Sequence, residues 1–180
     1  AIKGSMNSEQ VIVTALRMDE TNNASNSELR LLPFFAQLVY AKLYLKPLIG
    51  EPFYIKNYIP ETQERYWLSD ALCIDSPERL SALNTQSKGE LIKNAFKTKL
   101  TVNSKEREAI LIAYELIQQL SYGEVKKLVD NSNLHYYQSR EIPISLEWFV
   151  TQNQKELSVI YEIRKRIQRE VEYNVVISEK

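Results

Sequence analysis

The sequence predicts a mostly α-helical protein, a single-domain helical bundle of about six to seven helices with a short extended or β-hairpin segment near residues 47–60 and a long C-terminal helix. Apolar residues recur at spacings of three and four along much of the 180-residue chain, as they do on the buried faces of helices. Helix-capping residues precede several of these stretches. The chain has only 4 glycines and 6 prolines, too few for the many tight turns of an all-β protein.

The chain length predicts one domain, because 180 residues suffice for one continuous hydrophobic core. Residues 1–5, which precede Met6, are expected to be a remnant of a cloning vector. The predicted helical domain therefore covers residues 6–180. No internal repeat and no low-complexity linker divides it.

Two helices are predicted before residue 45. The first lies near Ser8 to Asp19, where apolar residues share one helical face. The second begins near Asn26, because Ser25 and Glu28 match a capping box, in which each side chain satisfies the other's free backbone N–H. Pro33 falls inside this helix and predicts either a kink or a later start, since proline removes a backbone donor and clashes with the preceding turn.

The stretch "KPLIGEPFYIKNYIP", residues 46–60, interrupts the helical pattern. It contains three prolines and one glycine, with aromatic residues between them. One regular helix cannot accommodate it, because a helix interior needs the backbone donors that proline lacks. The stretch predicts an extended or hairpin-like segment laid across the helices, with two short β-strands as one form of it.

Two further helices are predicted in the middle of the chain. Ser76 is a candidate cap, Pro77 suits the first helical position, and Glu78 complements the positive end of the helix dipole. The stretch "ELIKNAFKTKL", residues 90–100, has the apolar spacing of another short helix. The stretch "ERYWLSDALCI", residues 64–74, is ambiguous between strand and helix.

The strongest helical signal follows residue 103. Asn103 and Glu106 match a second capping box, and a wide apolar face extends over residues 109–120. Full burial of a leucine or isoleucine contributes roughly 1.5–3 kcal/mol, so this helix is expected to be the centre of the core. Ser121 and Glu124 match a third capping box, which predicts another helix directly after it.

The last part of the chain predicts a loop and then a long helix. The stretch "DNSNLHYYQSREIP", residues 130–143, is predicted to be a loop. Ser145 is the candidate cap of a helix from about Leu146 to Tyr173, and the polar "TQNQKE", residues 151–156, is a candidate bend in it. The apolar line of this helix exceeds what one small core needs, so we expect it to pair with a second copy as a homodimer.

Composition excludes several classes of function. Lys+Arg and Asp+Glu both number 23, so the formal net charge is zero, whereas a general nucleic-acid binder needs an excess of basic residues. No apolar run approaches the roughly 18 residues that cross a bilayer, and the N-terminus lacks the pattern of a signal peptide. The single cysteine, Cys73, cannot form an internal disulfide, which favours a reducing compartment. The expectation is a cytoplasmic protein without a membrane partner.

The sequence assigns no catalytic, cofactor-binding or metal-binding residue, and the protein is expected not to be an enzyme. His135 is the only histidine, and with one distant cysteine it does not supply the four donors of a zinc site. A nucleophile pair of Cys73 and His135 is disfavoured, because the apolar "ALCI" around Cys73 suits an inert buried thiol. Glutamates that are close in sequence are interpreted as solvated or capping groups: Glu51, Glu61, Glu64, Glu106 and Glu108. A small enzyme that uses Cys73 or these glutamates stays open as an alternative.

The only basic cluster is "RKRIQRE", residues 164–170, on the last helix. It supports an alternative function, a nucleic-acid-binding regulator that uses this helix. Glutamates are interleaved with it, and spacings of three or four favour ion pairs within the helix. A solvated, ion-paired face is the preferred interpretation.

Tyrosines near two predicted loops indicate a binding surface. Tyr54 and Tyr58 lie in the predicted hairpin, and Tyr136 and Tyr137 lie in the predicted later loop. Tyrosine combines apolar area with a polar tip and is enriched at protein interfaces. Loops anchored to the core by tyrosine are an equally good interpretation.

The same segments resemble the Panacea domain, the antitoxin domain related to the SocA-type antitoxins. That family shows a helix of the form L-x-K-L-L-Y-F-A-Q and then a segment of the form K-P-L-F-x-E-x-F-x-x-W-x-Y-G-P. The first form is matched by Leu29, Leu31, Leu32, Phe35, Ala36 and Gln37, and the second by Lys46, Pro47, Leu48, Glu51, Phe53, Tyr58 and Pro60. Residues 100–149 resemble the closing half of the family, so a Panacea-like core is expected over 7–150, with 151–180 as a helical extension.

The chain departs from the family at several positions. Lys56 stands at the tryptophan position and Ile59 at the glycine of Tyr-Gly-Pro. Asp130 replaces a histidine near the end of the penultimate helix, and His135 aligns with the proline of a later Pro-Trp. Residues 61–100 are unmatched. These departures imply a partner other than the family's usual ones.

The resemblance implies a non-enzymatic, antitoxin-like module that neutralises a partner protein, a bacterial toxin in this family, by direct binding. It also implies a prokaryotic source, with a phage or another mobile element as one origin. The expected partner-binding residues are Tyr54, Lys56, Tyr58, Tyr136 and Tyr137.

Overall fold

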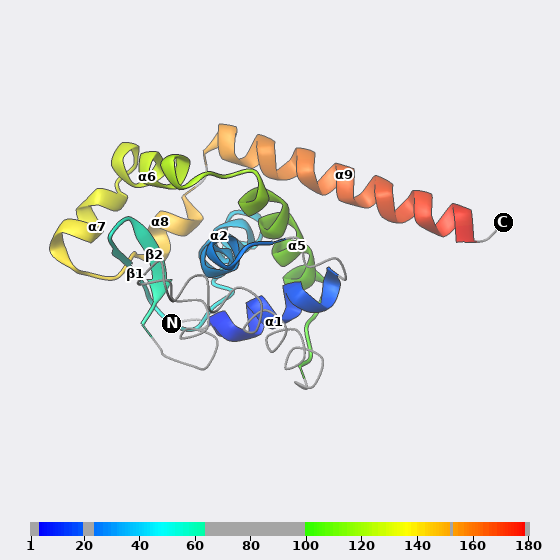
Figure 1. Ribbon diagram of the computed structural model, residues 1–180, viewed down its shortest axis with the longest axis horizontal. Coiled ribbons are helices and arrows are strands. Elements are labelled where there is room, and N and C mark those ends of the chain that lie inside the picture. The colour runs from blue at the N-terminus through cyan, green and yellow to red at the C-terminus, as the bar shows by residue number, and fades with distance from the viewer. Residues whose placement is uncertain (1–3, 20–23, 64–99, 152, 179–180) are drawn as a thin grey trace.

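The computed structural model describes residues 4–19, 24–63, 100–151 and 153–178. This part of the chain forms seven helices and one two-stranded antiparallel hairpin, which confirms the prediction of a mostly helical protein with a short hairpin (Figure 1). Within these ranges, no helix is both long and apolar enough to cross a membrane. The helices predicted after Ser76 and Glu90 lie outside the described residues, as do Glu64 and Cys73.

The first two helices begin where the sequence predicts. α1 (Ser8–Met18) precedes α2 (Asn26–Tyr44), and Ser25 and Glu28 form the predicted capping box at the start of α2. α2 continues through Pro33, so the alternative of a later start is wrong. Proline removes one hydrogen bond from the helix, and the extensive burial of α2 offsets that loss.

α2 and α5 (Ser104–Gln118) form the centre of the bundle, and α1 packs against both (Figure 1). The predicted capping box of Asn103 and Glu106 is present at the start of α5. The sequence predicts that α5 alone is the centre of the core, but α2 is buried at least as fully. Its fully buried side chains include Leu29, Leu32, Phe34 and Val39.

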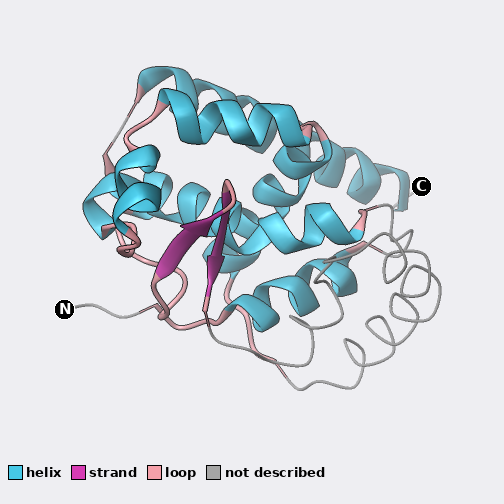
Figure 2. Ribbon diagram, turned by 60° about the vertical axis from the view of Figure 1, so that its left-hand side comes forward, coloured by secondary structure: helices cyan, strands magenta, loops and turns pink. Residues whose placement is uncertain are grey.

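β1 (Phe53–Lys56) and β2 (Ile59–Thr62) form the predicted hairpin (Figure 2). In its register, Ile55 lies opposite Pro60. Phe53 is fully buried, and its ring lies 5.9 Å from the ring of Phe34 in α2. The hairpin is therefore fixed to the core by one side of β1.

A buried glutamine fixes the path of the chain between α2 and β1. Gln37 Oε1 accepts hydrogen bonds from the backbone N–H of Leu48 at 2.8 Å and of Ile49 at 2.9 Å. A buried N–H without an acceptor costs roughly 1–3 kcal/mol, so the amide side chain offsets a large penalty. On the other side of this segment, the backbone of Met6 pairs with Leu48 and Gly50.

α6 (Tyr122–Asn131) follows α5 after a short connection. The Ser121 hydroxyl accepts the backbone N–H of Glu124, as its capping role predicts. The reciprocal half of the predicted capping box is not formed in the described part of the chain. The cap thus satisfies one helix donor rather than two.

The loop predicted over residues 130–143 is wrong, because most of it is helical. α6 extends to Asn131, and α7 (Leu134–Arg140) follows after a turn. Leu134 is the only fully buried residue in α7. A seven-residue helix with one core contact shows no apolar periodicity, which is why the pattern of the sequence misses it.

The predicted single C-terminal helix is two helices, α8 (Leu146–Val150) and α9 (Gln154–Ser178). The break falls inside the polar stretch that the sequence marks as a candidate bend. α9 packs on α5, and its C-terminal part projects beyond the rest of the molecule (Figure 1).

Candidate protein-binding face

The hairpin and α7 lie against each other, as expected for the segments that hold the predicted binding residues. The backbone N–H of Ile144, after α7, donates to the carbonyl oxygen of Phe53 in β1 at 2.8 Å. The backbone N–H of Tyr58 donates to Gln138 Oε1 of α7 at 2.8 Å. The second bond joins residues that are 80 positions apart in the chain. The fold therefore brings the hairpin tyrosines and the α7 tyrosines to the same end of the molecule.

The turn of the hairpin holds its tyrosine in a strained conformation. Asn57 has a φ of 53° and Tyr58 a φ of 66°, so both residues are left-handed. Two such residues are typical of a two-residue type I′ turn, where glycine is the preferred second residue. A side chain larger than that of glycine costs roughly 1–2 kcal/mol in this region. The bond to Gln138 and the ammonium of Lys126, which lies 5.1 Å from the centre of the Tyr58 ring, hold this turn in place.

The outward side of the hairpin carries two more of the predicted residues. Phe53 and Ile55 point into the core, so Tyr54 and Lys56 lie on the opposite face of β1. Tyr54 is half-buried and Lys56 is exposed. We name Tyr54, Lys56, Tyr58 and Lys126 the hairpin patch.

α7 carries a second pair of a cation and an aromatic ring. The side chain of Tyr136 is 49% exposed, and the guanidinium of Arg140 lies 3.9 Å from the centre of its ring. We name Tyr136 and Arg140 the α7 patch. Tyr137 beside it is half-buried, and its hydroxyl lies 2.9 Å from the hydroxyl of Ser145.

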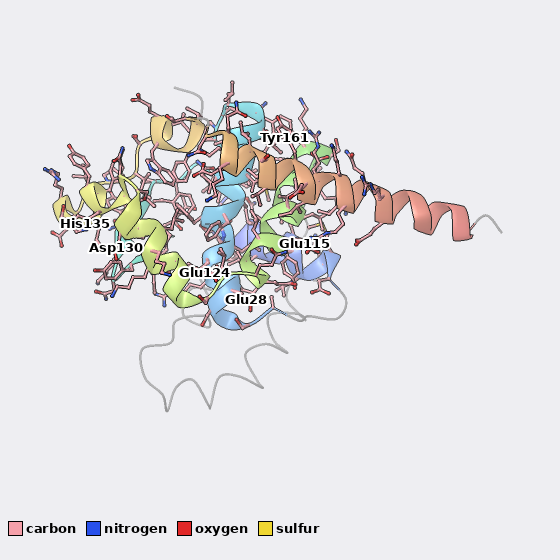
Figure 3. All side chains as sticks on the ribbon, turned by 90° about the horizontal axis from the view of Figure 1, so that it is seen from above. Glu28, Glu115, Glu124, Asp130, His135 and Tyr161 are labelled. Carbon is pink, nitrogen blue, oxygen red and sulfur yellow. The ribbon has the colours of Figure 1, made fainter. Side chains whose placement is uncertain are left out.

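The hairpin patch and the α7 patch are neighbours but do not form one continuous surface of rings. Residues two apart in a helix point about 200° apart, so Tyr136 projects away from Gln138, the α7 residue that meets the hairpin. The two segments therefore lie together as predicted, but their aromatic rings do not form one shared face. Asp130 and His135 lie at this same end, opposite the projecting end of α9 (Figure 3).

Two charged residues of these patches were missed by the sequence analysis. Arg140 follows Tyr136 by four positions, a spacing that places both on one side of a helix, but the prediction of a loop hid this signal. Lys126 lies 68 positions from Tyr58, and no local pattern links them. Among the described residues, Lys56, Lys126 and Arg140 have no carboxylate partner in an ion pair.

Most of the residues that match the Panacea pattern pack inside this fold and have structural roles. Most of them are buried: Leu29, Leu32, Phe35, Ala36, Gln37, Leu48, Phe53 and Pro60. Glu61, one of the clustered glutamates, forms a two-bond ion pair with Arg30 at 2.7 and 2.9 Å and so joins β2 to α2. The matched pattern thus mostly describes how the hairpin is attached. Among the matched residues Lys46 is exposed and Tyr58 is half-buried, and Lys56, at the family's tryptophan position, is exposed.

The basic cluster of α9 is partly neutralised by carboxylates of α5. Arg164 pairs with Glu108 at 2.8 Å, and Arg166 pairs with Glu115 at 2.9 Å. The sequence predicted ion pairs within the helix, but these two join different helices. Glu106, another of the clustered glutamates, is buried in its capping role.

The described residues offer no group of three histidine, cysteine, aspartate or glutamate side chains that could hold a metal ion. His135 is exposed. No protein-family model matches this chain, and no curated protein or solved structure matches it at a significant level. The resemblance to the Panacea domain therefore stays a prediction.

Proposed function

We propose that this chain is an antitoxin-like, non-enzymatic module that binds and neutralises a partner protein through the hairpin patch and the α7 patch. The antitoxin-like role comes from the resemblance, and the choice of surface comes from the geometry. One observation carries that choice. Two segments about 80 residues apart bring Tyr54, Lys56, Tyr58, Tyr136 and Tyr137 to one end of the molecule.

The chemistry of the two patches suits protein recognition. Tyrosine and arginine are enriched among the residues that dominate binding energy at protein interfaces. In both patches a cation lies over a tyrosine ring, which holds the cation in position before a partner arrives. The strained turn adds support, because strained backbone clusters at sites that clamp ligands.

Co-expression with the product of the adjacent gene tests the proposal. We expect the chain to restore growth of cells that produce that protein, and the two proteins to purify together. Tyr58→Gly removes the ring but keeps a residue that favours the left-handed turn, so it should weaken binding while the hairpin stays folded. Truncation of a central interface residue typically costs 2 kcal/mol or more, which is about a 30-fold loss of affinity.

The matched control is Tyr161→Ala on α9, which removes a tyrosine of similar exposure from outside both patches. It should leave co-purification unchanged. A complex that forms equally well with Tyr58→Gly and Tyr136→Ala would remove these patches as the binding surface. Failure of growth rescue together with failure of co-purification would contradict the antitoxin-like role itself.

The alternative of a nucleic-acid-binding regulator has less support. Two arginines of the basic cluster already pair with α5 carboxylates, so fewer charges are free to displace counterions from phosphate. A mobility shift at two salt concentrations distinguishes the two functions. Binding that weakens steeply with salt would favour the regulator.

A further inference from the structure

The break between α8 and α9 occurs without a residue that breaks helices. The sequence from Val150 to Glu156 has neither glycine nor proline. Thr151 is extended, with a φ of −61° and a ψ of 119°. Asn153 caps α9, because its carbonyl accepts the N–H of Leu157 at 3.0 Å and its side chain accepts the N–H of Lys155 at 2.9 Å. This stretch is therefore compatible with a continuous helix, and other contacts hold the break.

A buried lysine of α2 supplies one such contact. Lys42 is only 4% exposed, and its ammonium donates to the carbonyl oxygen of Thr151 at the break. The same ammonium lies 2.9 Å from Glu156 Oε2 in the first turn of α9. A continuous helix would use the Thr151 carbonyl for its own hydrogen bonding. Lys42 therefore favours the broken, closed arrangement.

α9 packs on α5 through apolar contacts and ion pairs. The α9 helix of a second copy of the chain would make the same contacts equally well. The buried residues of α9 include Leu157, Ile160 and Ile163. Beside them, arginines of α9 pair with Glu108 and Glu115 of α5. Two arginines and an apolar stripe of α9 thus lie on an acidic and apolar surface of α5, and an identical helix from a second copy would satisfy the same groups.

We propose that two copies of this chain exchange α9 and form a domain-swapped dimer, in which α8 and α9 straighten into one helix. Every contact between α9 and α5 is then remade between the two chains. The straightened helix gains backbone hydrogen bonds across the former break and loses the Asn153 cap and the Lys42 contact with Thr151. The balance of these terms and the concentration of the chain together decide the state. This partner is separate from the one at the hairpin and α7 patches.

A pair of substitutions at the break tests the proposal. Asn153→Ala removes the cap and favours a continuous helix. Because each swapped dimer contains two straightened breaks, its dissociation constant should fall roughly 5- to 900-fold, which corresponds to the loss of two caps. Gln154→Pro places proline at the first position of α9, where the closed form accepts it. In the interior of a straightened helix the same proline would remove the backbone hydrogen bond to the carbonyl of Val150 and clash with that carbonyl, so it disfavours the swapped form. Size-exclusion chromatography with light scattering over a wide range of concentrations should show only monomer for Gln154→Pro. Circular dichroism confirms that both variants fold.

A charge exchange distinguishes swapping from any other dimer. One chain carries Arg164→Glu and Arg166→Glu, and the second carries Glu108→Arg and Glu115→Arg. In either chain alone, like charges face each other between α9 and α5. In a swapped dimer of one chain of each kind, both interfaces regain opposite charges, so native mass spectrometry of the mixture should show predominantly the mixed dimer.

The two dimerisation experiments can each support or contradict the exchange of α9. Dimers of the wild type that disappear with Gln154→Pro, together with mixed dimers after charge exchange, support α9 exchange. A wild type and an Asn153→Ala variant that stay monomeric at every concentration would overturn it. So would a Gln154→Pro variant that dimerises like the wild type, or a mixture of charge variants without mixed dimers.

Discussion

At the scale of single residues, Tyr114 of α5 illustrates how a buried hydroxyl joins two helices. Its O–H donates to the carboxylate of Asp19, the residue that follows α1. Burial, and then the hydrogen bond and negative charge of Asp19, raise the pKa of Tyr114 well above its ordinary value near 10. The folded protein therefore binds the phenol proton more tightly than the unfolded chain does.

This raised pKa predicts a loss of stability at alkaline pH. The contribution of Tyr114 is fully present below pH 10, the unfolded pKa, and decreases as pH rises from there towards the higher folded pKa. Tyr114→Phe should cost roughly 1–3 kcal/mol at neutral pH through loss of the hydrogen bond, and it should make the alkaline decline shallower. Urea denaturation at several pH values between 8 and about 11 measures both effects. An unchanged alkaline slope would contradict the role assigned to this hydroxyl.

Gln37 supports a second prediction at this scale. Gln37→Met keeps the size and flexibility of the side chain but removes the acceptor for two buried backbone N–H groups, those of Leu48 and Ile49. The loss should destabilise the protein by roughly 2–5 kcal/mol. Hydrogen exchange should accelerate at these two amides before it does in the centre of α5. Equal protection of the two amides in the variant and the wild type would show that other groups hold this segment.

The sequence predicts interactions of residues that are close along the chain. The capping boxes of Ser25 with Glu28 and of Asn103 with Glu106 are confirmed, because three-residue spacing is a local geometric rule. The contact of Lys126 with Tyr58 depends on how two distant segments pack. The sequence could therefore indicate the tyrosines of the hairpin and α7 patches, but not the cations that lie over their rings.

At the scale of elements, the hairpin was predicted from its prolines, but the form of its turn was not. Local sequence favours glycine in a type I′ turn, and this chain has Tyr58 there. The same limit applies to α7, whose seven residues bury only Leu134, and to the break before α9, which Lys42 of a distant helix stabilises. In each case tertiary contacts override a weak local preference.

The turn yields a prediction that separates backbone strain from loss of the ring. Tyr58 is half-buried, and Tyr58→Gly and Tyr58→Val both remove its contact with Lys126, worth roughly 0.5–2 kcal/mol. Glycine accepts a φ of 66°, whereas the branched valine side chain strains it further. Tyr58→Gly should be nearly neutral for stability, and Tyr58→Val should be less stable than Tyr58→Gly by about 1–2 kcal/mol. Thermal or urea unfolding of the two variants checks this order, and equal stabilities would mean that the turn relaxes without strain.

At the scale of the whole molecule, the hairpin and α7 patches and the projecting part of α9 lie at opposite ends of the helical body (Figure 1). The Lys42 contact at the break before α9 shares no residue with the Tyr58 turn. Substitutions in separate regions without shared partners usually add in their effects on stability, whereas residues in direct contact do not. Two double-mutant cycles can therefore test whether the hairpin and the start of α9 behave as independent parts.

The first cycle combines Lys42→Met with Glu156→Gln. Glu156→Gln alone leaves the buried Lys42 ammonium without its carboxylate, and because the Glu156 side chain is 39% exposed we expect a cost of only about 1–3 kcal/mol. In the Lys42→Met background the same change should cost almost nothing, so the coupling energy should be about 1–3 kcal/mol. The second cycle combines Glu156→Gln with Tyr58→Gly, and its two effects should add to within about 0.5 kcal/mol. Strong coupling in the second cycle would mean that the hairpin and the start of α9 respond as one unit, so that exchange of α9 would also alter the surface proposed to bind the partner protein.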